Sequence, residues 1–73
     1  MTDAAPRTID ARGMRCPWPA IRLARALREG GGPVLLLADD PAAGGEAQAV
    51  AAAAGWRIDT PASAQFLLTR LTG

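Results

Sequence analysis

The only cysteine of the chain, Cys16, lies in the segment Arg15-Cys16-Pro17-Trp18-Pro19, directly ahead of a stretch with the apolar spacing of a helix. The free N–H groups and the dipole of a helix N-terminus stabilise negative charge, which here would be that of a thiolate. Arg12 and Arg15 add positive charge on the N-terminal side. The sequence therefore predicts sulfur chemistry at Cys16, with a pKa below the roughly 8.5 of a free thiol.

Cysteine is also a common small core residue that carries no chemistry. Its position here argues against that role, because Pro17 has no N–H and suits the first turn of a helix. Cys16 then falls at or next to the N-cap, where side chains point toward the free amides. We therefore expect an exposed and reactive thiol.

The composition excludes several other kinds of site. The chain has no histidine and one cysteine, so neither a structural zinc site nor a Cys-His hydrolase is expected, and a dithiol redox pair within the chain is excluded. No metal or other cofactor is predicted. The formal net charge of +1 gives no support for direct nucleic-acid binding, which favours a strong basic excess.

The 73 residues have room for one hydrophobic core, so we expect a single domain over residues 1–73. No signal-peptide pattern is visible, and the apolar runs are shorter than the roughly 18 residues that a membrane helix needs. The expected location is the cytoplasm, without membrane association.

Hydrophobic spacing predicts the elements that position Cys16. A short strand over residues 7–10 is followed by a turn that contains Gly13, and then by a helix over residues 17–29 that ends at the glycines 30–32. The expected core stripe of this helix is Ala20, Leu23, Ala24 and Leu27.

The second half of the chain repeats the strand–helix alternation. Residues 34–38 form an apolar run typical of a central strand or one buried on both faces. Asp40 is predicted as the N-cap of a second helix and Pro41 as its first residue. This helix is clearest over residues 46–54 and stops at Gly55; its apolar stripe is Ala47, Val50, Ala51 and Ala54.

Two further strands are expected over residues 56–59 and 65–71, with a turn at residues 61–63. The order β-α-β-α-β-β predicts an α/β (α+β) two-layer sandwich, in which two helices cover one face of a four-stranded mixed sheet. The first two strands should be parallel through a right-handed crossover, and the last two should form an antiparallel hairpin.

The segment Asp10–Pro19, followed later by Asp39–Ala43, resembles the TusA/SirA family of small sulfur-carrier proteins through its Cys-Pro-x-Pro motif. The resemblance implies a sulfurtransferase whose cysteine accepts sulfane sulfur as a persulfide from a cysteine desulfurase or rhodanese-like donor. The persulfide then passes to a reactive cysteine of an acceptor protein. Uses in the family include tRNA thiolation, molybdenum-cofactor biosynthesis and sulfur oxidation.

Residue by residue, the resemblance assigns the sulfur-bearing position to Cys16. In this resemblance Pro17 and Pro19 match the two prolines of the motif. Gly13 and Arg15 match the segment that leads up to the cysteine. The residues themselves are consistent with this role, because a persulfide carrier needs one accessible sulfur and no second cysteine that would resolve the persulfide as a disulfide.

Six further residues are candidates for partner contact: Arg12, Trp18, Arg22, Arg25, Asp39 and Asp40. Trp18 is either a docking anchor or a local packing residue. The arginines either steer an acidic partner or form a solvated helix face. The two aspartates either cap the second helix or reach the cysteine, since the loops after the first two strands lie at one sheet edge.

Two other functions are compatible with a small α/β domain. In a non-enzymatic regulatory or interaction module, Cys16 would be incidental. RNA binding is disfavoured by the near-neutral charge and by the lack of aromatic residues on a sheet face.

Overall fold

In the computed structural model, which describes residues 6–71, the elements follow in the predicted order β-α-β-α-β-β. Residues 1–5 and 72–73 of the predicted domain lie outside the described residues. The bounds are β1 Arg7–Asp10, α1 Trp18–Glu29, β2 Val34–Leu37, α2 Ala43–Ala54, β3 Trp56–Ala62 and β4 Gln65–Arg70.

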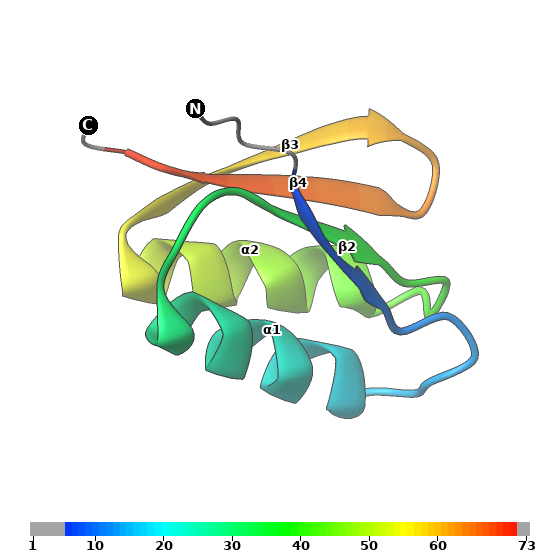
Figure 1. The fold of residues 1–73 in the computed structure, drawn as a ribbon. Helices are drawn as coiled ribbons and strands as arrows, with labels where there is room; N and C mark the ends of the chain where they lie inside the picture. The colour runs from blue at the N-terminus through cyan, green and yellow to red at the C-terminus, as the bar shows by residue number, and fades with distance from the viewer. Residues whose placement is uncertain (1–5, 72–73) are drawn as a thin grey trace.

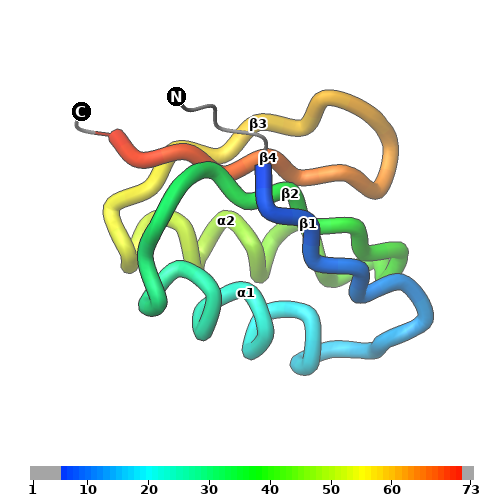
Figure 2. Tube along the Cα trace, in the orientation of Figure 1, coloured from blue at the N-terminus to red at the C-terminus, as the bar shows by residue number. Residues whose placement is uncertain are grey.

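The strands form one mixed sheet in the order β1-β2-β4-β3. β1 and β2 are parallel, with Ile9 opposite Leu36, whereas β4 is antiparallel to both β2 and β3. Both helices cover the same face of this sheet (Figure 1). Because β1 and β2 run the same way, the loops after them meet at one end of the molecule, next to the first turns of α1 and α2 (Figure 2).

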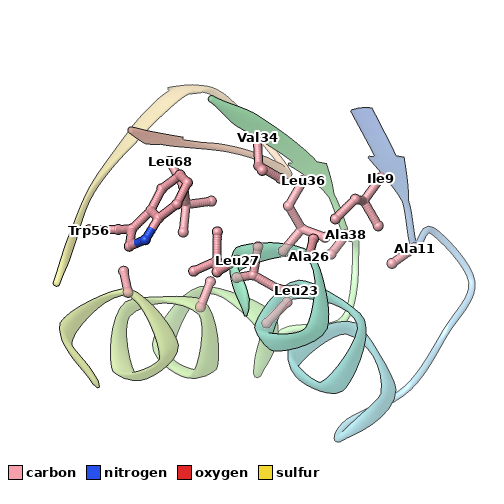
Figure 3. Packing of buried hydrophobic residues seen from close by; sticks show 13 residues of the cluster. Ile9, Ala11, Leu23, Ala26, Leu27, Val34, Leu36, Ala38, Trp56 and Leu68 are labelled. Carbon is pink, nitrogen blue, oxygen red and sulfur yellow. The ribbon is translucent and has the colours of Figure 1, made fainter. Parts of the chain in front are cut away.

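The core lies between the sheet and the helices (Figure 3). Leu23 of α1, Leu36 of β2 and Leu68 of β4 are fully buried there. The buried side chains of α2 are the small residues Ala43, Ala47 and Ala51, and the half-buried Val50 also packs against the core. Most of the remaining surface of α2 is exposed.

The buried stripe of α1 differs in part from the prediction. Leu23 and Leu27 are buried as expected, but Ala20 and Ala24 are only half-buried, and Pro19 and Ala26 complete the buried face instead. The helix is therefore rotated slightly about its axis relative to the expected stripe, which leaves Ala20 and Ala24 at its boundary with α2.

α2 begins later than predicted. Its N-cap is Ala42 rather than Asp40, and Pro41 lies in the preceding turn. Asp40 still accepts a hydrogen bond from the N–H of Ala42 at 2.8 Å, so its carboxylate caps that turn instead of the helix. Within the predicted apolar stripe of α2, Val50 is half-buried and Ala54 is exposed.

The last hairpin is antiparallel, but its turn is not at residues 61–63. β3 continues to Ala62 past a register shift between Asp59 and Ala62, and the turn is formed by Ser63 and Ala64, the latter with a φ of 60°. The irregularity accommodates Pro61, whose missing N–H prevents a regular ladder bond. No helix in the described part of the chain is long and apolar enough to cross a membrane.

Candidate functional site

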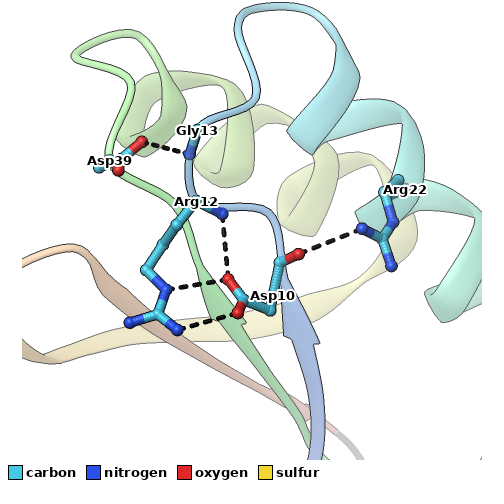
Figure 4. Close-up of polar contacts among 5 residues, drawn as sticks. All are labelled: Asp10, Arg12, Gly13, Arg22 and Asp39. Atoms are coloured by element: carbon cyan, nitrogen blue, oxygen red, sulfur yellow. Dashed lines mark hydrogen bonds and ion pairs between the residues drawn. The ribbon is translucent and has the colours of Figure 1, made fainter.

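Two loops at the same edge of the sheet build the surroundings of Cys16. Gly13, in the loop after β1, has a φ of 83°, a backbone conformation that side-chain-bearing residues rarely adopt. Its N–H donates a hydrogen bond to Asp39 Oδ1 at 3.0 Å, in the loop after β2 (Figure 4). This hydrogen bond connects the turn at Gly13 to the loop after β2.

Asp40 makes the second connection between these loops. Its Oδ2 accepts a hydrogen bond from the N–H of Cys16 at 2.8 Å, while its Oδ1 accepts the N–H of Ala42. The hydrogen bonds from Ala42 and Cys16, in that order, hold the pKa of Asp40 below its ordinary value, and the charge of Arg15 contributes less. A single carboxylate therefore fixes both the cysteine backbone and the turn before α2.

Cys16 is exposed and immediately precedes Pro17, the N-cap of α1, through a cis peptide bond. Its thiol donates a hydrogen bond to Oε2 of Glu46, which lies in the first turn of α2. The other oxygen, Oε1, is buried and has no hydrogen-bond partner among the described residues. The Cys16 sulfur thus faces a carboxylate from the second helix.

The prediction of a lowered pKa for Cys16 is wrong. The hydrogen bond to Glu46, followed by partial desolvation and by the negative charges of Glu46 and Asp40, raises the pKa of Cys16 above its ordinary value. A thiol that donates to a carboxylate is stabilised in its protonated form. The carboxylates of Glu46 and Asp40, which are distant in sequence, outweigh the helix terminus and the nearby arginines.

Arg12 does not supply the expected positive charge at the thiol. Its guanidinium binds both carboxylate oxygens of Asp10 at 2.9 Å, and these hydrogen bonds lower the pKa of Asp10 to about 2 (Figure 4). Arg22 donates to the backbone carbonyl of Asp10 at 3.2 Å, and Arg25 pairs with Glu29 at 3.5 Å. These three arginines are thus engaged within the chain.

The two remaining motif residues have different environments. Pro19 is buried at the second position of α1, whereas Trp18 is 59% exposed. Trp18 also lines a shallow depression with Gly13, Met14, Arg15 and Arg22. The indole is not part of the buried core, and its two predicted roles, docking anchor and local packing residue, both stay predictions.

A mostly apolar groove runs between the two helices beside the cysteine. Its lining includes Pro17 and Ile21 from the α1 side and Glu46 and Val50 from α2. Ile21 is 49% exposed, so this groove offers apolar surface directly adjacent to the thiol.

The structure brings together Cys16, Gly13, Asp39 and Asp40 from the predicted set. It adds Glu46, which the sequence reasoning did not select. The available signal was its place in the first turn of a helix that follows the Asp39-Asp40-Pro41 loop, because that loop was expected to share the sheet edge with Cys16. The described residues contain no group of three or more histidine, cysteine, aspartate or glutamate side chains that could hold a metal ion.

A two-layer fold that presents one exposed thiol at the start of its first helix fits a sulfurtransferase. Residues 7–65 match the family model described as Sulfurtransferase TusA. The match spans most of the chain, and the protein therefore belongs to the TusA sulfurtransferase family. The resemblance drawn from the Cys-Pro-x-Pro motif is confirmed.

Proposed function

We propose that the protein is a persulfide carrier that accepts sulfane sulfur on Cys16 and delivers it to a cysteine of an acceptor protein. The observation that carries the proposal is the exposed thiol of Cys16, held at the start of α1 in a chain of the sulfurtransferase family. The chain has no other cysteine, so a persulfide formed there cannot be resolved within the molecule.

The relay consists of two sulfur transfers. In the first, Cys16 Sγ bonds to the outer sulfur of a donor persulfide, and the donor cysteine leaves as a thiolate that takes up a proton. In the second, an acceptor thiolate attacks the outer sulfur of the Cys16 persulfide, and Cys16 leaves and is reprotonated. The sulfane sulfur changes its partner in each step, and no external oxidant or reductant is needed.

The partners that fit this chemistry are a cysteine desulfurase or a rhodanese-like protein as donor, and a protein with a reactive cysteine as acceptor. A location in the cytoplasm suits the carrier, because thiols stay reduced there. tRNA thiolation is one of the family's uses that such a carrier would serve, beside molybdenum-cofactor biosynthesis and sulfur oxidation.

Mass spectrometry of the intact protein tests the carrier function. Incubation with a desulfurase and cysteine, or with a rhodanese and thiosulfate, should add one sulfur atom that dithiothreitol removes. Cys16→Ser should gain none. The same mass gain in Cys16→Ser would contradict the assignment, and failure of the wild type to load from either donor would favour a non-enzymatic interaction module.

A further inference from the structure

Glu46 is the only side chain in the described residues that forms a hydrogen bond with the Cys16 sulfur. It comes from a different helix, and one of its oxygens meets the thiol while the other is buried without a partner. Burying a carboxylate oxygen without a hydrogen bond is unfavourable, which makes a purely structural role a poor account of this arrangement.

We propose that Glu46 is a further catalytic residue of the sulfur transfer, whose carboxylate accepts the thiol proton as Cys16 Sγ bonds to the incoming sulfane sulfur. This assignment rests on the carrier function proposed above. A general base must contact the group whose proton it takes, and Oε2 of Glu46 contacts Cys16 Sγ directly.

The step balances without a further reactant. The S–H bond of Cys16 breaks and its proton moves to Oε2, while the sulfur electron pair forms the new bond to the outer sulfur of the donor persulfide. The S–S bond of the donor breaks, and its inner sulfur leaves with the electron pair. That thiolate takes the proton from Glu46, so the carboxylate is regenerated and a persulfide and a thiol are the products.

The electrostatics of the site explain why such a base is needed. The charged groups that act on the thiol are Glu46 from α2 and Asp40 from the loop after β2, and Arg15, next in the chain, acts on Asp40. The two carboxylates raise the pKa of Cys16, so the thiolate is less favoured here than in a free cysteine. A proton acceptor already in contact with the thiol lets the neutral form react directly.

The decisive variant is Glu46→Gln, because it gives opposite expectations for two reactions of the same sulfur. Alkylation by iodoacetamide reports the fraction of free thiolate, whereas loading from glutathione persulfide reports sulfur transfer. Without the negative charge, the pKa of Cys16 falls, and alkylation at pH 7 should become about threefold faster or more. Loading should become about tenfold slower or more, since a positioned acid–base group contributes about 10²–10⁴-fold.

Glu29→Gln is the matched control, because Glu29 lies at the opposite end of α1 and pairs with Arg7 and Arg25. Both rates should stay at the wild-type values in this variant. Glu46→Asp keeps a carboxylate and should recover part of the loading rate, and it replaces Glu46→Gln in the comparison if circular dichroism shows that the amide variant is unfolded.

The outcomes separate the two proposals. If alkylation and loading both accelerate in Glu46→Gln, the carboxylate only disfavours thiolate formation, and the catalytic assignment is overturned. Unchanged rates, or a parallel fall of both, overturn it as well. A wild-type protein that alkylates at Cys16 but loads from no donor instead removes the carrier function on which the assignment rests.

Discussion

The carboxylate of Asp40 accepts a hydrogen bond from the backbone N–H of Cys16 at 2.8 Å, across 24 positions of sequence. The position of the thiol is thus set by the loop after β2 as well as by its own loop. Since Asp40 also binds the N–H of Ala42, the start of α1 and the approach to α2 are coupled through one side chain.

Asp40→Asn should lower the stability of the fold in a pH-dependent way. The pKa of Asp40 is lowered in the folded state, so its stabilising contribution is fully present above the unfolded value of about 3.9 and is lost as the pH falls through the folded pKa. Urea unfolding of the wild type and the variant should therefore show a difference at pH 7 that shrinks toward pH 3. A difference that stays constant over this range would contradict the role of the ionised carboxylate.

The thiol of Cys16 should titrate at a higher pH in the folded protein than in the unfolded chain. Glu46 raises its pKa, so the thiolate that reacts with iodoacetamide forms only at more alkaline pH. Alkylation rates measured between pH 6 and pH 11 should give a midpoint above that of the same protein in urea, where the thiol titrates near its free value of about 8.5. A folded-state midpoint below the urea value would show that the helix terminus dominates after all.

Two glycine substitutions should act in opposite directions. Gly13→Ala places a side chain at a φ of 83° and should destabilise the protein by about 1–2 kcal/mol. Gly45→Ala lies inside α2 with open space around it and should stabilise the protein by about 0.5–1 kcal/mol. Chemical denaturation measures both, and equal effects of the two changes would exclude this backbone explanation.

Leu36→Ala should be far more costly than Leu35→Ala. Leu36 is fully buried between the sheet and the helices, and its truncation should cost about 2–5 kcal/mol, a large part of the stability of a domain this small. Leu35 points to the other face of β2 and is only half-buried, so its truncation should cost about 1 kcal/mol. Equal losses of unfolding free energy in the two variants, measured in urea, would contradict a core on the Leu36 face of the sheet.

Trp18→Ala should separate docking from packing. Because the indole is 59% exposed, its removal should change the free energy of unfolding by less than about 0.5 kcal/mol. Loading from a desulfurase should nevertheless slow, if the tryptophan anchors the donor, while loading from glutathione persulfide should not. A marked loss of stability would indicate that Trp18 is a packing residue instead.

The element order and the sheet follow from local patterns in the sequence. The apolar run at residues 34–38 gives a central strand, and the glycines after Glu29 end α1 as predicted. The predicted start of α2 is wrong: α2 begins at Ala43, and the carboxylate of Asp40 binds the N–H groups of Ala42 and Cys16. Hydrogen bonds of that kind join distant positions, and no local pattern reveals them.

The environment of the thiol was predictable only in part. The exposure of Cys16 and its place ahead of α1 follow from the prolines around it. The carboxylate of Glu46 does not, because its contact with the sulfur depends on how α2 packs beside α1. The predicted direction of the pKa shift of Cys16 is wrong for the same reason.

The two edge strands of the sheet, β1 and β3, are poorly suited to pair with a further strand. β1 is only four residues long, and β3 carries Pro61 and a register shift near its end. Short length, a proline and an irregular ladder all make a strand a poor template for adding another chain. Strand addition by a second copy of the chain is therefore disfavoured along both edges of the sheet.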